Sequence, residues 1–400
     1  MIYLDWAASA PPEADILDAV RDVSLNRFAN PSAAHGPGRG AEAVMSSCRA
    51  RLAALLAASP REIVFTSGGT ESNNLICLSL LARSPGGSPG ARTRTVVLSG
   101  LEHPSVSEPA RLLEEAGFRV VRVPPDHTGI LEPQRMADAL DESTVLVSVM
   151  HVSNEIGSVQ PVEEIGRAVA AFSGRIGRRI PLHSDAVQSF GKLPLTPGAW
   201  GLDAVTVSAH KIGGPRGIGA LWIREDSQFP PLLRGGGQET GRRPGTENLA
   251  GIVGLTAAAE RKCGRMRGDL EIARALERRL ISGILDIPLA RIVPEGRVGA
   301  AEDAWSPYIV AAAFPPIPGE VLMSALDARG ICVSTGSACS ARHGRLPAAL
   351  LAMGYPEKTA RCMVRISLGA RTTTEEIDAF LCAAREETAV LGRMAGKGRR

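Results

Sequence analysis

The sequence predicts an α/β fold: a mostly parallel sheet flanked by helices, followed by a smaller α+β domain. Up to about residue 247, short apolar runs alternate with segments of helical periodicity. Several of these runs are apolar on both faces, as in a parallel sheet that is buried between two layers of helices. Beyond that point a long helical stretch with charge pairs such as "ARALERRL" leads into shorter strands and helices.

The individual elements follow from this alternation. The expected strands are the apolar runs at 62–67, 95–99, 118–123, 144–152, 180–184, 203–208 and 219–223. The expected helices between them include 41–58, 71–82, 104–116 and 161–172. Later helices are expected up to about 285 and near 374–391. The segment "RSPGGSPGARTR" at 83–94 is typical of a surface loop.

Composition excludes several classes of partner and location. The net charge of +3 gives no strong field for a nucleic acid or a membrane. The opening "MIYLDWAASAPP" has neither the basic start nor the apolar stretch of a signal peptide, and no apolar run approaches the length of a membrane span. The seven cysteines are scattered, with no C-x-x-C pair or Cys/His cluster that would indicate a metal site. We therefore expect a cytoplasmic protein without a bound metal.

Three expected strands end on polar residues, which should meet in one crevice at the carboxyl edge of the sheet. Taken singly, each has an ordinary explanation. Asn154 could shape a turn, Asp185 could cap the following helix, and Lys211 could be a solvated surface lysine. Lys211, however, follows an apolar strand and precedes the glycine-rich "IGGPRGIG". The full set at these strand ends is Asn154, Asp185, Gln188, Ser208, His210 and Lys211.

A fourth feature is the glycine turn in "VFTSGGTESNN", where a strand runs through Gly69 into Thr70 at a helix start. Such a turn suits either an N-cap or an anion at the helix N-terminus. Together with Lys211 and Asp185 it forms the set that pyridoxal phosphate requires. A lysine forms a Schiff base, a carboxylate pairs with the pyridinium nitrogen, and a helix N-terminus anchors the phosphate.

Cys339 stands in "STGSACSARHG", among small and flexible residues. Cysteine is usually a small buried hydrophobe, but these flanks indicate a loop, and loops often carry function.

The residues resemble those of the cysteine desulfurases, a branch of the class V aminotransferases. The motifs occur in the family's order along nearly the whole chain: "YLDWAASAPP", "EIVFTSGGTESNN", "LEHPSV", "MHVSNEIGSVQP", "HSDAVQSFGK", "VSAHKIGGPRGIGAL", "GGGQETGRRPGTENLAGI", "STGSACS" and "VRISLG". The resemblance implies the fold of fold-type I pyridoxal-phosphate enzymes. With it we expect a large cofactor domain over 13–250, and a small domain of 1–12 and 251–400 that carries the cysteine loop.

The resemblance also implies a role for each site residue. Lys211 would form the Schiff base, and Asp185 would pair with the pyridine nitrogen. Gln188 and Asn154 would bond the cofactor's phenolic oxygen. The phosphate would be held by Gly69, Thr70, Ser208 and His210, and by Thr246 from the second subunit of a homodimer.

Three further roles concern the substrate, L-cysteine. His103 would stack on the ring and move protons, Arg365 would bind the substrate carboxylate together with Asn154, and Cys339 would be the nucleophile. Two of these residues have structural alternatives. His103 could belong to a helix start, and Arg365 could be a strand salt-bridge residue.

The product would be alanine and a persulfide on Cys339. A cysteine on a hinged loop could then pass the sulfur to an acceptor protein, such as a scaffold for iron–sulfur cluster assembly. The chain departs from the family near this residue: the family's loop usually runs through a Leu-Glu-Pro segment, whereas "SARHGRLPAALLAMG" lacks the Glu and gains positive charge from Arg342, His343 and Arg345. A second departure is "ASAP" near the N-terminus in place of an "ATTP"-like segment.

Other functions fit the same motifs. A selenocysteine lyase would use the same scaffold, and another class V lyase or aminotransferase would leave Cys339 incidental. A sulfur-relay scaffold protein on a decayed enzyme fold is the non-catalytic alternative, although decay should have removed Lys211 or Asp185.

Overall fold

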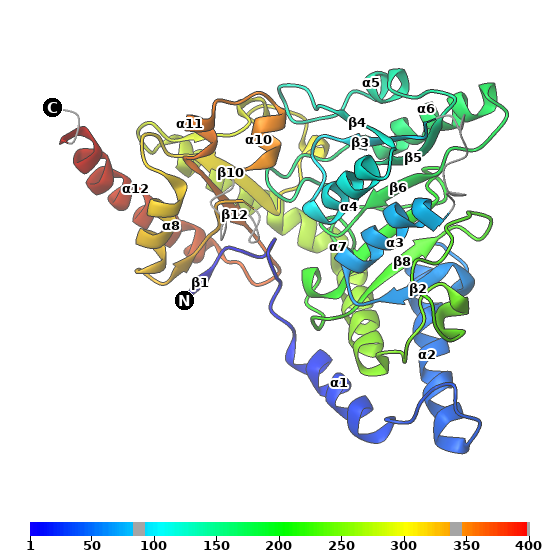
Figure 1. Cartoon of the computed structure of the whole chain (residues 1–400). Helices are drawn as coiled ribbons and strands as arrows, with labels where there is room; N and C mark the ends of the chain where they lie inside the picture. The colour runs from blue at the N-terminus through cyan, green and yellow to red at the C-terminus, as the bar shows by residue number, and fades with distance from the viewer. Residues whose placement is uncertain (83–92, 337–345, 398–400) are drawn as a thin grey trace.

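The computed structural model describes residues 1–82, 93–336 and 346–397. A seven-stranded sheet forms its largest element (Figure 1). All neighbouring strands run parallel except at β8, which is antiparallel to the strands on both of its sides. In spatial order the strands are β2 (Ile63–Thr66), β8 (Gly219–Ile223), β7 (Ala204–Ser208), β6 (Leu182–Asp185), β5 (Thr144–Ser148), β3 (Thr95–Ser99) and β4 (Arg119–Val123).

Helices cover both faces of this sheet, which explains why its strands are apolar at successive positions. In β3, Val96 packs with helices α3 and α4 in one core cluster, while its neighbour Val97 packs with α2, α6 and α7 in another. Because side chains alternate across a strand, each strand needs apolar residues on both faces. The helices around the sheet are α2 (Gly36–Leu55), α3 (Gly69–Ala82), α4 (Pro104–Glu115), α5 (Pro133–Asp138), α6 (Val162–Arg175) and α7 (Leu249–Leu285).

A second group of elements surrounds two smaller sheets, near which both chain termini lie (Figure 1). β9 (Arg291–Ile292), β10 (Ile309–Ala313) and β12 (Met363–Ser367) form an antiparallel sheet, and β1 (Ile2–Tyr3) pairs in parallel with β11 (Ile331–Cys332). The helices of this group are α8 (Gly319–Asp327), α10 (Ala348–Ala352), α11 (Glu357–Ala360) and α12 (Thr374–Lys397). Helix α1 (Ala14–Asn26) instead packs against α7, and its Ile16 belongs to the core of the seven-stranded sheet (Figure 1).

Helix α7 contributes to the cores of both groups. Its first half buries Ile252 and Leu255 beneath the seven-stranded sheet, and its second half buries Leu280 and Ile284 against the three-stranded sheet. The division of the chain into domains at 13–250 and 251–400 stays a prediction. In the part of the chain that is described, no helix combines the length and the apolar character needed to cross a membrane.

Candidate active site

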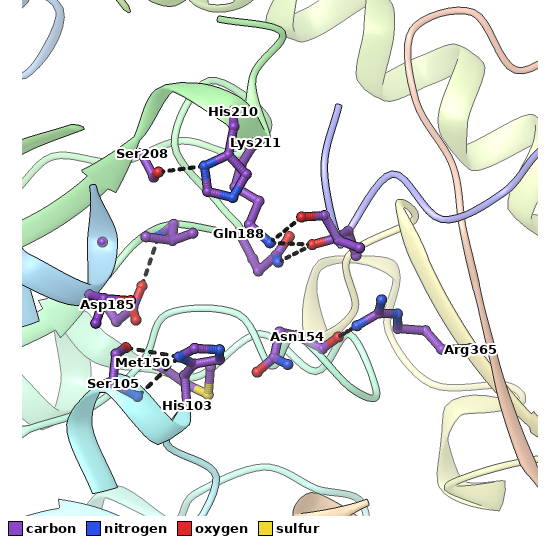
Figure 2. Close-up of a pocket in the computed structure, with 15 residues that line it drawn as sticks. His103, Ser105, Met150, Asn154, Asp185, Gln188, Ser208, His210, Lys211 and Arg365 are labelled. Atoms are coloured by element: carbon purple, nitrogen blue, oxygen red, sulfur yellow. Dashed lines mark hydrogen bonds between the residues drawn. The ribbon is translucent and has the colours of Figure 1, made fainter. Parts of the chain in front are cut away.

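A cavity of about 240 Å³ opens at the carboxyl ends of β5, β6 and β7 (Figure 2). The chain places ligand-binding residues there because the parallel strands all end at this edge of the sheet. Ten of the predicted site residues line it: Gly69, Thr70, His103, Asn154, Asp185, Gln188, Ser208, His210, Lys211 and Arg365. The sheet therefore brings together residues that are far apart in the sequence.

Lys211 ends a single 3₁₀ turn, Ala209–Lys211, directly after β7. Its Nζ donates hydrogen bonds to the carbonyl oxygens of Ala7 (2.5 Å) and Ala8 (2.9 Å). These carbonyls belong to the segment after β1, so the N-terminal residues close the cavity around the amine. The partly buried amine is thus held in place at the cavity, unlike a solvated surface lysine.

Asp185 is the last residue of β6 and is 5 % exposed. Its Oδ1 accepts a hydrogen bond from the Val187 N–H (2.9 Å), and its Oδ2 accepts one from Asn73 Nδ2 (2.8 Å). The first bond shapes the turn after the strand, where the alternative had expected a helix cap, and the second fixes the carboxylate at the cavity wall. A carboxylate held in this way suits a protonated ring nitrogen.

Gln188 and Asn154 complete this side of the cavity. Gln188 Nε2 donates to the Ala7 carbonyl (2.9 Å), while its buried Oε1 has no hydrogen-bond partner in the described part of the chain. A buried amide atom without a partner costs free energy unless a ligand satisfies it. The wall of the cavity thus has a polar group that a bound ligand could satisfy.

His103 both caps a helix and lines the cavity. It is the N-cap of α4, where its Nδ1 accepts a hydrogen bond from the Ser105 N–H (3.1 Å), and its ring also lines the cavity. Burial lowers the pKa of His103, and Lys211 lowers it further against the opposite effect of Asp185. The ring is therefore held neutral, with Nδ1 as its acceptor and its other nitrogen facing away from the helix start.

The start of α3 forms one wall of the cavity through Gly69 and Thr70. Gly68 has φ +148°, and a Cβ on Gly69 would lie 2.9 Å from Val187 Cγ2, so only glycine lets the backbone approach this closely. Thr70 lies in the first turn of the helix and is not its N-cap. Exposed N–H groups at a helix start are suited to an anion.

Ser208 and His210 face the same end of the cavity from the β7 side. Ser208 Oγ lies 2.9 Å from His210 Nδ1. Burial lowers the pKa of His210 to about 4, and Lys211 and Arg216 shift it in the same direction. If Ser208 Oγ donates to Nδ1, the neutral imidazole carries its hydrogen on Nε2. That N–H can then donate to a phosphate oxygen. The residues present therefore fit pyridoxal phosphate.

Arg365 is 1 % exposed, in the centre of β12. Its Nη1 donates to the Asn154 carbonyl (2.8 Å) and its Nη2 to Asp5 Oδ1 (2.7 Å), while its Nε has no hydrogen-bond partner among the described residues. The salt bridge that was considered as an alternative is present, and the guanidinium also lines the cavity. The bond to Asp5 shows that the Arg365 guanidinium can donate to a carboxylate at this position.

Of the other two predicted site residues, Thr246 does not line the cavity and is exposed in the loop before α7. Cys339 lies in 337–345, outside the described residues. The Thr246 loop is anchored through Glu239, which accepts hydrogen bonds from Arg49 and from the Phe65 N–H (2.9 Å). Ala349, which follows the undescribed segment in the sequence, donates its N–H to Glu155 Oε2 (2.8 Å) and so ties the start of α10 to the loop after β5.

Sequence reasoning missed five residues that line the cavity: Ala7, Ala8, Ser105, Met150 and Val187. Ala7 and Ala8 act through backbone carbonyls, which carry no sequence signal beyond their position in "YLDWAASAPP". Ser105 could have been found from its spacing, because a residue two positions after a helix N-cap regularly bonds to the cap.

Glu102 precedes His103 and is buried, with 7 % of its surface exposed. Its Oε1 accepts hydrogen bonds from Ser99 Oγ (2.7 Å) and the Met150 N–H (2.6 Å), whereas its Oε2 has no partner among the described residues. Burial raises the pKa of Glu102 to about 8; the Ser99 bond lowers it and the nearby Asp185 raises it. Glu102 is therefore mostly protonated at neutral pH.

We predict that Glu102→Gln stabilises the protein increasingly as the pH rises. A carboxyl group whose folded pKa is raised loses stability from about its unfolded value of roughly 4.3 up to its folded value, at about 1.4 kcal/mol per pH unit. Gln keeps the Oε1 acceptor and cannot ionise. Urea unfolding at pH 5.5 and 7.5 should show that the advantage of the variant grows by roughly 2–3 kcal/mol. The exposed Glu357→Gln is the matched control, and an equal advantage at both pH values would contradict the prediction.

Comparison with known proteins finds relatives along nearly the whole chain. Residues 2–380 match the family model for aminotransferase class-V. A cysteine desulfurase of Cereibacter sphaeroides is 40% identical over 382 residues, covering 95% of this chain and 94% of that protein. A solved NifS-like protein superposes with a TM-score of 0.86 at 32% identity, over 97% of this chain and 99% of the other.

A second solved structure, SspA in complex with cysteine, has a TM-score of 0.77 at 33% identity and covers 92% of this chain and 99% of its own. The match in fold confirms the predicted α/β architecture with its mostly parallel central sheet. The matched region includes the strand ends that carry Asp185 and Lys211. The chain belongs to the aminotransferase class-V family, and within it to the pyridoxal-phosphate-dependent cysteine desulfurases.

Proposed function

We propose that this enzyme removes sulfur from L-cysteine, forms L-alanine, and carries the sulfur as a persulfide on Cys339. The observation that supports this most strongly is the cavity that joins the Lys211 amine, the Asp185 carboxylate and the start of α3. Bound pyridoxal phosphate supplies an electron sink that activates the bonds around the substrate's amino carbon. SspA, a structural relative, was solved in complex with cysteine.

The residues around the cavity attach the cofactor, hold its phosphate and transfer protons. Lys211 provides the amine for covalent attachment of the cofactor and can carry a proton to and from the substrate carbon. Asp185 keeps the ring nitrogen protonated, while the start of α3, Ser208 and His210 hold the phosphate. In neutral His103 the Nδ1 lone pair accepts from the Ser105 N–H, so the ring hydrogen lies on Nε2, and the residue can donate a proton to the substrate.

Arg365 and Asn154 position the substrate. Arg365 would exchange its bond to Asp5 for the substrate carboxylate, which offers the same pair of oxygens. Its Nη1 would remain bonded to the Asn154 carbonyl, which keeps the guanidinium in place. The carboxylate would then lie on the β12 side of the cavity.

Sulfur transfer balances as follows. The Cys339 thiolate attacks the substrate sulfur, an S–S bond forms, and the carbon–sulfur bond breaks. The electron pair of the broken bond stays on the β-carbon of the substrate, which takes up a proton. The product then leaves as alanine. The sulfur is released from Cys339 by a second thiol on an acceptor or by a reductant.

Purified enzyme with L-cysteine and a small thiol should form alanine and sulfide in equal amounts. Alanine without sulfide would contradict the proposal and indicate a different class V reaction. The same assay with selenocysteine distinguishes a desulfurase from a selenocysteine lyase, because the lyase would prefer the selenium substrate. A colourless purified protein that binds no cofactor would instead indicate the sulfur-relay scaffold.

We further propose that the enzyme works as a cytoplasmic homodimer in which Thr246 reaches the phosphate of the partner's cofactor. Thr246 is exposed, and its loop is held rigidly at Glu239, as a residue that acts across an interface requires. Light scattering should give the mass of two chains. Thr246→Ala should weaken cofactor binding without dissociating them, and a monomer of full activity would rule out the dimer.

The sulfur acceptor is proposed to be a protein with an acidic surface, such as an iron–sulfur scaffold. Arg342, His343 and Arg345 follow Cys339 closely and lie outside the described residues. Exposed charges mainly change encounter rates, and salt screens them over roughly 8–10 Å. The alternative is that these charges only keep the loop soluble.

We predict that Arg342→Glu with Arg345→Glu leaves alanine formation with a small thiol nearly unchanged. Transfer of sulfur to the native acceptor should slow, and its dependence on salt should flatten. The measurement is the rate of transfer at low and high ionic strength, with Arg361→Glu, which changes an exposed arginine outside this segment, as the control. Unaffected transfer at low ionic strength would show that the charges only solvate the surface.

A further inference from the structure

An ion pair joins the loop before α7 to the first turn of α3. Arg243 Nε donates a hydrogen bond to Glu71 Oε1 (2.8 Å), and its Nη2 donates one to Glu71 Oε2 (3.3 Å). The two side chains are only 24 % and 17 % exposed, and a two-pronged bond between such partly buried groups is stronger than a single bond at the surface. Neither residue lines the active-site cavity, so the pair can act on the cavity only through the residues next to it.

Glu71 shapes the turn that leads into α3. Its Oε2 accepts a hydrogen bond from the Ser67 N–H (2.6 Å). This bond resembles the return bond of a capping box, in which an acidic residue of the first helical turn reaches back to the backbone before the helix. The Gly68 N–H is bonded to Thr66 Oγ1 (3.3 Å). Because these two N–H groups are occupied, the groups available to an anion are those from Gly69 onward, where the helix meets the cavity.

The Glu71 carboxylate also places a negative charge at the helix start that is proposed to hold the phosphate. Burial raises the pKa of Glu71, but the bonds from Arg243 and Ser67 outweigh this effect and hold the pKa below its usual value. The carboxylate is therefore ionised at neutral pH. A helix start stabilises negative charge, but an unbalanced carboxylate there would repel a phosphate that binds to the same turn.

Arg243 is the cation that offsets this charge. Hydrogen bonding to Glu71 is the largest of the effects that raise the pKa of Arg243, ahead of the charges of Glu239 and Glu247 on its own loop. Glu239 is itself bonded to a different arginine, Arg49, at 2.7 and 2.6 Å. Glu71 is therefore the main partner of Arg243, and the pair as a whole carries no net charge.

We propose that Arg243 is a positioning residue for the cofactor phosphate, because it cancels the charge of Glu71 and lets Glu71 hold the turn before α3 without repelling the phosphate. The inference rests on the proposed phosphate site at the start of α3. It adds two residues to that site that lie outside the cavity and set its electrostatic potential.

Binding of the cofactor with and without its phosphate tests this role. The apoenzyme is titrated with pyridoxal phosphate and with pyridoxal, and the change in absorbance gives both dissociation constants. Arg243→Gln leaves the Glu71 charge unbalanced, so it should weaken binding of pyridoxal phosphate by roughly 5- to 30-fold and binding of pyridoxal much less. Arg167→Gln, which breaks exposed ion pairs on α6, is the matched control and should bind both ligands as the wild type does.

Removing the carboxylate charge separates electrostatics from structure. Glu71→Gln keeps an acceptor for the Ser67 N–H and has no charge, so it should bind pyridoxal phosphate at least as tightly as the wild type. Combined with Arg243→Gln, it should restore most of the lost affinity. High salt should also reduce the loss in Arg243→Gln, since charges are screened over about 3 Å at 1 M.

The pattern of losses decides between the explanations. Equal losses for pyridoxal and pyridoxal phosphate in Arg243→Gln, with no recovery in the double variant, would mean that Arg243 only supports the fold and would overturn the proposal. A preference for the phosphorylated ligand that Arg243→Gln keeps in full would overturn it as well, and would leave the phosphate site standing. A wild type that binds both ligands equally well would contradict the phosphate site itself, and this inference with it.

The double variant carries the test if Arg243→Gln alone does not fold. With neither charge present, it should fold and keep the wild-type preference for pyridoxal phosphate over pyridoxal. Loss of that preference would show that Arg243 acts on the phosphate in some way other than by balancing Glu71, which contradicts the proposal.

Discussion

Lys211→Ala is expected to abolish covalent attachment of the cofactor and to reduce alanine formation by roughly 100- to 10,000-fold. The amine is the group that forms the imine and then moves a proton, and no other amine replaces it among the described residues that line the active-site cavity. The fold should survive, because the side chain contributes two hydrogen bonds to the Ala7 and Ala8 carbonyls and little apolar packing. Absorbance in the visible range and a steady-state alanine assay measure the two effects.

Borohydride reduction and peptide mapping identify the attached lysine directly. In the wild type and in Lys192→Met, the label should appear on the Lys211 peptide. Lys192 is the informative competitor, because its pKa near 7 would make it a reactive amine if the cofactor could reach it. A label on Lys192 or on any other lysine would overturn the assignment of Lys211.

Cys339→Ser is expected to separate the two halves of the reaction. The variant should bind the cofactor and L-cysteine normally, since the cavity residues that hold them are unchanged. It should release almost no sulfide and carry no persulfide, because a serine hydroxyl is a poor nucleophile at neutral pH and cannot hold transferable sulfur. The spectral change on adding L-cysteine reports binding, and a sulfide assay reports transfer.

Cys382→Ser is the matched control, because Cys382 is an exposed cysteine on α12. It should keep full activity. Cys77 cannot substitute for Cys339 in either variant, since burial raises the pKa of its thiol to about 12 and leaves it unreactive. Near-normal sulfide release by Cys339→Ser would show that the cysteine is incidental to the reaction.

Much of the fold could be predicted from the sequence because buried parallel strands carry a strong local pattern. The runs at 95–99 and 219–223 coincide with β3 and β8. The run at 144–152 was predicted too long: the strand ends at Ser148, and the apolar residues beyond it line the cavity and its surroundings. The reversed direction of β8 has no local signal, since pairing with β2 and β7 is a long-range property.

The candidate site was predictable where chemistry resides in side chains at strand ends, as for Asp185 and Lys211. It was not predictable where backbone groups act, as for the Ala7 and Ala8 carbonyls that accept from Lys211. The partnership of Arg365 with Asp5 was also hidden, because it joins the two ends of the chain. Lys192 illustrates the same limit, since its burial beside three other cations follows from tertiary packing alone.

The most direct test of the proposed chemistry is a single turnover without reductant. Cofactor-loaded enzyme mixed with one equivalent of L-cysteine per chain should form one equivalent of alanine. The peptide that contains Cys339 should gain the mass of one sulfur atom, and the peptides of the other six cysteines should not. Free sulfide with no sulfur on Cys339, or a persulfide on another cysteine, would contradict the account.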